Sequence, residues 1–463
     1  MSQQRIAIIG GGPGGYEAAL VAAQLGAEVT VVERDGLGGS CVLTDCVPSK
    51  TLIATSTMMA GLEGSASLGV RVTGDGNGHV LLDARRLSAR VLSLARAQSA
   101  DVAARLSAEG VKVVSGTGRL AGPHRVVAGD TEIEADAVLI ATGAQPRVLP
   151  GAEPDGERIV TWRQLYDLTE LPPELIVVGS GVTGAEFAGA YQALGSQVTL
   201  VSSRARVLPH EDADAAVVVE DVFRRRGMTV LSRSRAERVT RTGDGVAVIL
   251  SDGRTVRGSH CLLTVGMVPN TEGLGLAEAG IEVDDHGFVS VDKVSRTSAP
   301  GVYAAGDCTG VLMLASVAAM QGRIAMWHAL GEAVKPLRLS HVVAAIFTEP
   351  EIATVGVPEQ AVASGEVPDA VVVKLPLATN ARAKMQGFRD GFVKIIARRS
   401  TGTVVGGVIV APRASELILA LSLAVERQLT VDNVAHTFAV YPSLSGSLTE
   451  AARKLMQPAE ATS

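Results

Sequence analysis

Short apolar runs alternate with glycine-rich turns and alanine-rich stretches in the first part of the chain. Residues 6–9 are apolar, glycines follow within residues 10–15, an alanine-rich stretch comes next, and residues 29–33 form a second apolar run. Apolar runs of four or five residues predict buried strands, and the alanine-rich stretch predicts a helix between them. The pattern therefore predicts a strand–turn–helix–strand unit at the N-terminus.

The same order returns in the middle of the chain. Residues 175–178 predict a strand, residues 179–184 a glycine turn, the stretch through Ala193 a helix, and residues 198–201 a second strand. Each unit is followed, after a variable stretch, by a short apolar strand and a small turn, at residues 137–144 and 261–270. This indicates an internal duplication whose period is far too long for a solenoid.

From about His341 the pattern changes. Alternating strands are predicted at residues 392–396 and 404–410, followed by helical segments over residues 414–428. This order is typical of an α+β domain. The fold class expected for the whole chain is α/β, with two Rossmann-like dinucleotide-binding domains plus a C-terminal α+β domain.

Composition excludes several classes of protein. A chain of 463 residues exceeds what one hydrophobic core supports, and 47% hydrophobic residues with 51 glycines describe a well-packed globular protein. The net charge is −6 and the sequence contains no run of basic residues, so nucleic acid is not an expected partner. The sequence has no uninterrupted stretch of about 20 apolar residues, so no integral membrane segment is expected. Four cysteines are too few for a disulfide scaffold in a chain of this length. Because proteins without such a scaffold are typical of the reducing cytosol, we expect a cytoplasmic protein.

The first glycine turn has the spacing of a dinucleotide site. Gly10, Gly12 and Gly15 form G-x-G-x-x-G between a strand and a helix, and Glu33 ends the next strand. The glycines allow a tight turn, close approach of a pyrophosphate and tight packing of the helix on the strand. The helix N-terminus attracts phosphates, and Glu33 is suited to a ribose diol.

The second glycine turn lacks the acidic residue. Gly179, Gly181 and Gly184 repeat the motif, but the position that matches Glu33 is Ser202. It begins a segment of hydroxyl and cationic side chains: Ser202, Ser203, Arg204 and Arg206. A carboxylate there would repel a 2′-phosphate, whereas these groups accept one, so NADPH or use of both NADPH and NADH is expected.

Cys41 and Cys46 are too far apart for a disulfide if their segment is a straight helix. Residues five apart in a helix have Cα atoms roughly 8–9 Å apart, and a disulfide needs about 4.4–6.8 Å. A bridge therefore requires a non-helical turn, which Asp45 and the glycines before Cys41 allow, with Pro48 in the first turn of the next helix. Cys261 and Cys308 have no metal-ligand spacing, and no metal site is expected.

These motifs together resemble the flavoprotein disulfide reductases, the family of lipoamide dehydrogenase and glutathione reductase, over essentially the whole length. The resemblance also rests on Ala141-Thr142-Gly143-Ala144, on Val268-Pro269-Asn270-Thr271 after Gly266, and on residues 301–307 with Gly306 and Asp307. It implies an FAD-binding domain at residues 1–148 and 271–338, an NAD(P)H-binding domain at 149–270, and a C-terminal dimerisation domain at 339–463 of a homodimer.

The resemblance also assigns roles to single residues. It implies that Cys41 and Cys46 form a redox disulfide, with Cys46 the sulfur nearest the flavin. It places Lys50 and Glu186 as an ion pair near flavin N5, and Asp307 on the ribityl chain.

The C-terminal segment departs from the family pattern. Disulfide-reducing members carry His-Pro-Thr followed by a glutamate, whereas here Tyr441 replaces the histidine and Gly446 the glutamate. A phenol with a pKa near 10 is a poor base at pH 7, and loss of a general acid–base costs about 10²–10⁴-fold. His436 is out of register and is expected to be a surface or capping residue. Met267 in place of arginine and Asp45 in place of glycine are smaller departures.

The expected activity is hydride transfer from NAD(P)H to FAD and then electron transfer to a quinone, which needs no protein base of this kind. The sequence resembles the branch of the family that lacks the histidine–glutamate pair, with Tyr441 near the acceptor. Three alternatives remain open: a disulfide reductase that uses Cys41 and Cys46 and acts on lipoamide or a similar small disulfide, a nucleotide transhydrogenase, and a non-catalytic flavin subunit of a larger complex.

Overall fold

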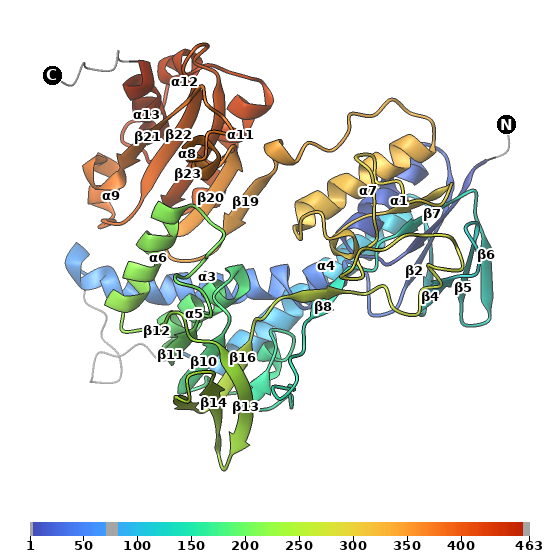
Figure 1. Ribbon diagram of the computed structural model, residues 1–463, viewed down its shortest axis with the longest axis horizontal. Coiled ribbons are helices and arrows are strands. Elements are labelled where there is room, and N and C mark those ends of the chain that lie inside the picture. Colours follow the sequence, from blue (N-terminus) through green and yellow to red (C-terminus); the bar gives the residue numbers. More distant parts are fainter. Residues whose placement is uncertain (1–2, 71–81, 457–463) are drawn as a thin grey trace.

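The computed structural model describes residues 3–70 and 82–456. Three large sheets divide this part of the chain into three units (Figure 1). The first sheet is parallel and has the order β18-β7-β1-β2-β3. Its strands are β1 (Arg5–Ile9), β2 (Glu28–Glu33), β3 (Lys112–Ser115), β7 (Ala137–Ile140) and β18 (Val302–Ala304).

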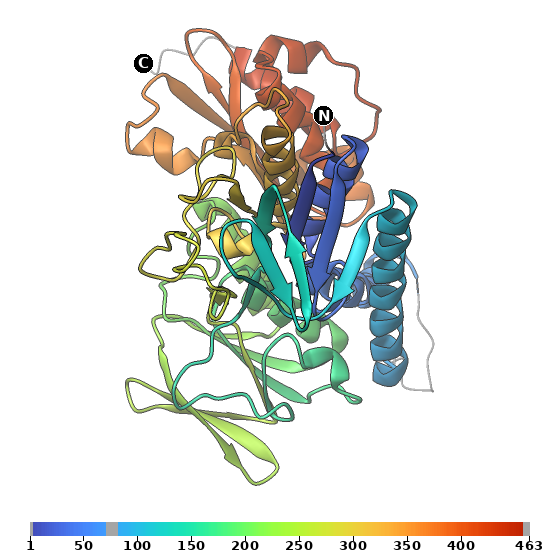
Figure 2. The same ribbon diagram turned by 90° about the vertical axis from the view of Figure 1, so that its right-hand side faces the viewer.

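Each face of the first sheet is covered by different elements, as the view in Figure 2 shows. One face packs against helices α1 (Pro13–Gln24), α4 (Ala84–Ala108) and α7 (Ala315–Ala329). The other face packs against the small sheet of β4 (Gly118–Leu120), β5 (Arg125–Ala128) and β6 (Thr131–Glu134). Because both faces are covered, residues 6–9 of β1 and 29–32 of β2 are buried, which confirms the strands predicted at residues 6–9 and 29–33.

The second sheet repeats this architecture. It is parallel, in the order β12-β11-β10-β16-β9, and α5 (Val182–Leu194) follows β10 as α1 follows β1. Its strands are β9 (Ile159–Val160), β10 (Glu174–Val178), β11 (Gln197–Val201), β12 (Thr229–Leu231) and β16 (His260–Leu263). A hairpin sheet covers one face, made of β13 (Ala236–Thr242), β14 (Gly245–Leu250) and β15 (Thr255–Gly258). The predicted internal duplication is confirmed.

Two features join the first and second units. The chain leaves the first unit through β8 (Ala144–Pro146) and returns through β17 (Met267–Pro269), and these two strands pair antiparallel. The short α2 (Gly39–Leu43) leads into the long helix α3 (Cys46–Gly64), which contacts α5 of the second unit (Figure 1). The cysteine segment therefore lies where the two units meet.

The third unit is the expected α+β domain. Its antiparallel sheet has the order β19-β20-β23-β22-β21, with β19 (Val343–Ile346), β20 (Glu351–Gly356), β21 (Ala370–Pro376), β22 (Phe392–Arg398) and β23 (Val404–Ala411). The helices are α8 (Glu359–Ala363), α9 (Ala381–Met385), α10 (Ala414–Leu417), α11 (Leu419–Glu426), α12 (Val431–His436) and α13 (Gly446–Met456). The helical stretch predicted over 414–428 is two helices and ends earlier, because Gln428 has a left-handed φ of 54°.

A buried lysine joins the second and third units. Lys394 on β22 is fully buried, and its Nζ lies 2.7 Å from Asp212 and 3.0 Å from Asp214, at the start of α6 (Ala213–Arg225). Glu359 completes the set of carboxylates around this ammonium. Three carboxylates so close together resemble a metal site, but the lysine already supplies the positive charge between them.

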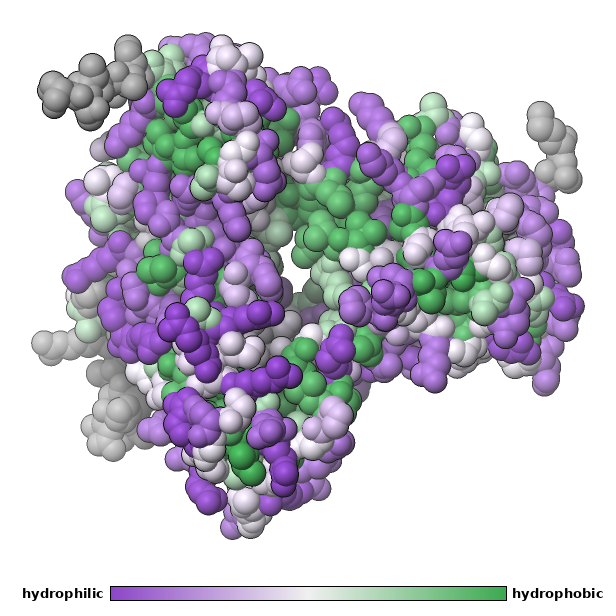
Figure 3. Space-filling view, viewed as in Figure 1, coloured by the Kyte–Doolittle hydropathy of each residue, from purple (hydrophilic) through white to green (hydrophobic). Residues whose placement is uncertain are grey.

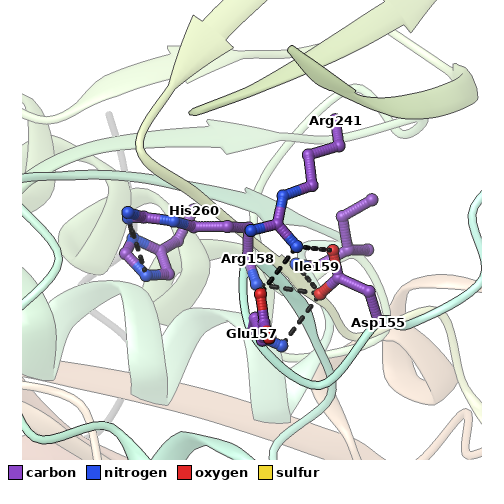
Figure 4. A network of polar contacts seen from close by, with 6 residues as sticks. All are labelled: Asp155, Glu157, Arg158, Ile159, Arg241 and His260. Atoms are coloured by element: carbon purple, nitrogen blue, oxygen red, sulfur yellow. Dashed lines mark hydrogen bonds and ion pairs between the residues drawn. The ribbon is translucent and has the colours of Figure 1, made fainter. Parts of the chain in front are cut away.

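A second polar network lies where β9 and β16 begin (Figure 4). Asp155 accepts backbone hydrogen bonds from Glu157, Arg158 and Ile159 at 2.8–2.9 Å, and Arg241 bridges Glu157 and Asp155. Arg158 Nη1 lies 3.3 Å from Nε2 of the buried His260. A guanidinium only donates, so the His260 ring must accept and is neutral. Burial and the charge of Arg158 lower the pKa of His260 to about 4.

We expect His260 to make stability depend on pH between 6.5 and 4. Because its folded pKa lies below the unfolded value, the unfolded chain takes up the proton first and stability falls as pH falls through this range. The expected loss between pH 7 and pH 5 is about 2 kcal/mol. Urea unfolding followed by tryptophan fluorescence should show a shallower pH dependence for His260→Gln. Equal slopes for the variant and the parent would contradict this account.

Candidate active site

The first glycine turn is built for close approach of a ligand. Gly10 has φ 104°, and a Cβ there would lie 2.3 Å from the carbonyl oxygen of Ala141. A Cβ on Gly15 would lie 1.8 Å from the carbonyl oxygen of Gly10, so these two glycines are required by the packing of the protein itself. A Cβ on Gly12, by contrast, would meet nothing within 4 Å. Gly12 caps the N-terminus of α1, so the open space lies where a pyrophosphate is expected.

Three polar side chains around this turn fit a dinucleotide that carries a flavin. Glu33 is fixed at the end of β2, because its carboxylate accepts from the backbone N–H groups of Gly11 (2.6 Å) and Asp35 (2.6 Å). Thr142 Oγ1 is buried and has no partner in the part of the chain that the structure describes. Burial, with a smaller effect of Asp45, raises the pKa of Asp307 to about 6, and its carboxylate accepts no hydrogen bond from the described residues. Hydroxyl groups of a ligand would satisfy both of these groups.

The second glycine turn has the same construction. Gly179 has φ 112° and packs on the carbonyl of Thr264, and a Cβ on Gly184 would lie 2.0 Å from the carbonyl oxygen of Gly179. A Cβ on Gly181, at the N-terminus of α5, would again meet nothing within 4 Å. The turn fits a second dinucleotide.

The segment after β11 divides into an internal and an exposed part. Ser202 is fully buried, and its hydroxyl bonds Ser180 Oγ at 2.7 Å and accepts from Arg204 N at 3.1 Å. Its hydroxyl therefore shapes the turn, and the structure does not support the direct contact with the nucleotide that was expected. Ser203 and Arg204 are exposed, and Arg206 is half-buried. These three side chains stay candidates for the 2′-phosphate site.

Cys41 and Cys46 come together through the non-helical turn that the sequence predicts. Helix α2 ends at Leu43 and α3 begins at Cys46, with Asp45 at φ −125° and ψ −96° between them. Gly38 and Gly39 before the turn have positive φ, which glycine adopts without strain. Both cysteines are free thiols, and their side chains lie close enough for each to change the pKa of the other. Sharing of a proton between the two thiols lowers the pKa of Cys41 and raises that of Cys46.

Lys50 and Glu186 form the expected ion pair. Lys50 Nζ lies 2.7 Å from Glu186 Oε2, and the Glu186 side chain is only 4% exposed. The other carboxylate oxygen of Glu186 accepts from Phe347 N at 2.8 Å, and the Lys50 ammonium lies 4.8 Å from the Phe347 ring centroid. The pair joins α3, α5 and the third unit, and Lys50 keeps a positive charge one helical turn from Cys46, since the carboxylate raises its pKa.

Tyr441 and His436 lie outside this arrangement. Tyr441 is 86% exposed and makes no hydrogen bond or ring contact with a described residue. His436 is an exposed residue in the last turn of α12, with Nδ1 3.0 Å from Asp432 O, which confirms its expected capping role. No histidine of the described ranges bonds the cysteine pair.

Two family models match the chain, and together they cover most of it. The model of the pyridine nucleotide-disulphide oxidoreductases matches residues 4–322, and the model of their dimerisation domain matches residues 342–452. The chain belongs to the pyridine nucleotide-disulphide oxidoreductase family. The resemblance in the sequence and the predicted fold class are thereby confirmed. The chain is an oxidoreductase of this family, with the family's cofactors FAD and NAD(P)H, and both glycine turns fit them.

Several proteins with different names are similar to this chain over nearly its whole length. An NAD(P)H dehydrogenase (quinone) of Mycobacterium tuberculosis is 58% identical, over 98% of this chain and 94% of that protein. A dihydrolipoyl dehydrogenase of Chlorobaculum tepidum is 34% identical, over 98% of both chains. Among solved structures, LpdA of Mycobacterium tuberculosis has a TM-score of 0.92 at 57% identity, over 98% of this chain and all of that one. The flavoprotein disulfide reductase RclA of Escherichia coli has a TM-score of 0.86 at 26% identity, over 97% of this chain and 99% of that one.

The structure adds residues that the sequence pattern did not single out. Gln321 on α7 is buried and accepts from Gly306 N at 2.9 Å, which fixes the turn before Asp307. Asn270 donates to the carbonyl oxygen of Thr142 at 2.9 Å and so ties β17 to the Thr142-Gly143 turn. Phe347 supports the Lys50–Glu186 pair from the third unit. Only Asn270 had a signal in the sequence, as part of the Pro-Asn-Thr turn that follows Gly266.

Proposed function

We propose that this chain is an NAD(P)H:quinone oxidoreductase that takes hydride from NAD(P)H and reduces a quinone. Bound FAD supplies the hydride acceptor and passes electrons onward. The protein groups that this reaction needs are both glycine turns and the Lys50–Glu186 pair. The 58% identical NAD(P)H dehydrogenase (quinone) supports the same acceptor class.

The observation that carries the proposal is Tyr441 in the position of the family's base. Attack on a disulfide substrate needs a group that holds and returns a proton beside the cysteines. Tyr441 is a phenol, it is exposed, and it makes no hydrogen bond within the described residues. A quinone takes protons from solvent, so its reduction does not need such a group. We propose that Tyr441 lies beside the acceptor.

We propose the following roles for the residues around the two turns. The Gly12 and Gly181 turns hold the two pyrophosphates at helix N-termini, with Glu33 beside the first ribose. Thr142 and Asp307 receive hydroxyl groups of the flavin's side chain. Lys50 holds a positive charge near the reacting end of the flavin, and Glu186 orients it.

The first test offers a naphthoquinone and lipoamide side by side, at equal concentration, to the FAD-loaded protein with NADPH. We expect the quinone to be reduced faster by about 100-fold or more, because a missing acid–base costs that much with a disulfide. Faster turnover of lipoamide would mean that another group supplies the proton, and the role given to Tyr441 would then be wrong.

A disulfide reductase is the second candidate function. The contact between the Cys41 and Cys46 thiols favours it, because the pair can form and open a disulfide. The 34% identical dihydrolipoyl dehydrogenase is a relative with that reaction in its name. Product analysis in the same assay, with dihydrolipoamide measured directly, separates the two functions.

NADPH is the proposed donor in preference to NADH. Arg204 and Arg206 follow β11 at the edge where the nucleotide's ribose is expected. We expect the double change of both arginines to alanine to raise the KM for NADPH by about tenfold, which corresponds to about 1.4 kcal/mol, and that for NADH much less. Equal changes for both nucleotides would refute the 2′-phosphate site.

A homodimer in the cytoplasm is proposed as the working form. The dimerisation-domain match supports the dimer. So does the segment before Tyr441, in which Phe438 is fully exposed and Val440 is 78% exposed, since such apolar surface marks an interface. Figure 3 shows further apolar surface in the hollow between the third unit and α7. No helix in residues 3–70 or 82–456 is long and apolar enough to cross a membrane.

The domain boundaries are part of this proposal. We assign FAD binding to residues 1–148 and 271–338, NAD(P)H binding to 149–270 and dimerisation to 339–463. The assignment rests on which strands enter each of the three large sheets. Residues 1 and 463 lie outside the described ranges.

A further inference from the structure

Asp45 lies in the turn between the two cysteines, directly before Cys46, and its carboxylate has no partner among the described residues. Its backbone N–H donates to Ser40 O at 2.7 Å, and its carbonyl accepts from Ser49 N at 2.7 Å, so the backbone is fixed. It is the N-cap residue of α3, yet its side chain makes no capping bond. Within the described residues this carboxylate has neither a hydrogen bond nor an ion pair.

The cations near Asp45 do not neutralise it. Lys50, five residues on, is bound to Glu186 at 2.7 Å. Arg163, in the segment after β9, interacts with Asp45 electrostatically but forms no ion pair with it among the described residues. Its guanidinium lies over Trp162, 5.9 Å from the ring centroid, and its buried Nε has no hydrogen-bond partner among those residues. Tyr166, from the short helix after Arg163, also interacts with Asp45 electrostatically, and its buried hydroxyl has no hydrogen-bond partner among the described residues.

The remaining groups around Asp45 are acids. Glu186 lies on α5, Asp307 on the turn after β18, and the thiols of Cys41 and Cys46 on either side of the turn. A negative charge on Asp45 therefore opposes the formation of a second negative charge on either sulfur. It adds to the raised pKa of Cys46, and at Cys41 it acts against the contact with Cys46 that lowers the pKa of that thiol. Burial and Glu186 in turn raise the pKa of Asp45.

We propose that Asp45 suppresses thiolate formation on the Cys41–Cys46 pair and thereby keeps this site from thiol–disulfide exchange. The thiolate is the nucleophile in such exchange, so a carboxylate beside the pair lowers the reactive fraction at neutral pH. Asp45 acts here through the sulfurs and is a positioning residue. The inference rests on the proposed function, because it explains why an intact pair of cysteines does not make this chain a disulfide reductase.

The test is the rate of alkylation by iodoacetamide of the FAD-loaded, dithiothreitol-reduced protein between pH 5 and pH 9. We expect Asp45→Asn to react about tenfold faster than the parent at neutral pH, which corresponds to a thiol pKa lower by one unit. The two profiles should converge at acid pH, where Asp45 of the parent is protonated. Asp45→Glu, which keeps the charge, should retain the parent profile.

The controls separate charge from structure. Asp101→Asn removes an exposed carboxylate on α4 and should leave the profile unchanged. Cys41→Ser and Cys46→Ser identify the sulfur that reacts. If Asp45→Asn does not retain FAD, Asp45→Gly takes its place in the same assay.

Profiles of Asp45→Asn or Asp45→Gly within twofold of the parent over the whole pH range would overturn the proposal. The assay contains no quinone and no disulfide substrate. Its outcome is therefore independent of which acceptor wins in the turnover assay, and failure of one proposal is distinguished from failure of the other.

Discussion

Gly12→Val is expected to fold and to lose FAD. Because a Cβ on Gly12 would meet no protein atom within 4 Å and the φ of Gly12 is −69°, the backbone has room for a side chain at this position. The same side chain would occupy the space at the N-terminus of α1 where the pyrophosphate must approach the backbone. We expect the affinity for FAD to fall about 100-fold or more, a loss of about 3 kcal/mol. Flavin absorbance of the purified protein measures it.

Two further variants make this result specific. Gly181→Val places the same change at the N-terminus of α5, where a Cβ also meets nothing, and should retain FAD while raising the KM for NADPH. Gly61→Ala in α3 adds a Cβ in open space away from both turns and should change neither. Loss of FAD in Gly181→Val, or its retention in Gly12→Val, would reverse the assignment of the two sites.

Lys50→Met should damage both stability and reduction of the flavin. The change leaves the carboxylate of Glu186 buried without its cation, and breaking a buried ion pair from one side costs about 3 kcal/mol. Removing a positive charge aimed at the reacting group should also slow reduction of FAD by NADPH by about 100-fold. Stopped-flow absorbance at the flavin band measures the rate, and urea unfolding measures the stability.

Lys374→Met is the matched control. Lys374 also pairs with a carboxylate, Asp214 at 3.0 Å, and also lies over a ring, 5.5 Å from the centroid of Phe392, but it is 44% exposed. An exposed pair contributes about 0–1 kcal/mol, so this variant should be nearly as stable as the parent and reduce FAD at the parent rate. Equal losses of stability and of the rate of FAD reduction in both variants would contradict the role proposed for Lys50.

The sequence predicted those parts of the molecule, such as the two glycine turns, where the backbone geometry accepts only one type of residue. Gly10, Gly15, Gly179 and Gly184 are required by backbone contacts within each turn, so their spacing alone located both turns. The non-helical turn between Cys41 and Cys46 was predicted from two Cα–Cα distances. Residues five apart in a helix are farther apart than the Cα atoms of a disulfide.

Contacts between segments that are distant along the chain could not be predicted from the sequence. Ser202 was expected on the nucleotide, but its hydroxyl is taken by Ser180, which only the register of two parallel strands brings near it. Gln321 supports the turn before Asp307 from a helix 15 residues away. Asp45 looked like a minor substitution, because its lack of a partner depends on how Lys50 and Arg163 are already engaged.

The antiparallel pair of β8 and β17 has a consequence for engineering. Because Ala144 lies opposite Pro269, the two ends of the intervening segment are neighbours in space, as in a protein that accepts a whole insert at one surface loop. The segment between β8 and β17 can therefore be exchanged as one unit. A counterpart from a relative with another coenzyme preference could be spliced in at these two strands, provided that the graft brings its own carboxylates for Lys394.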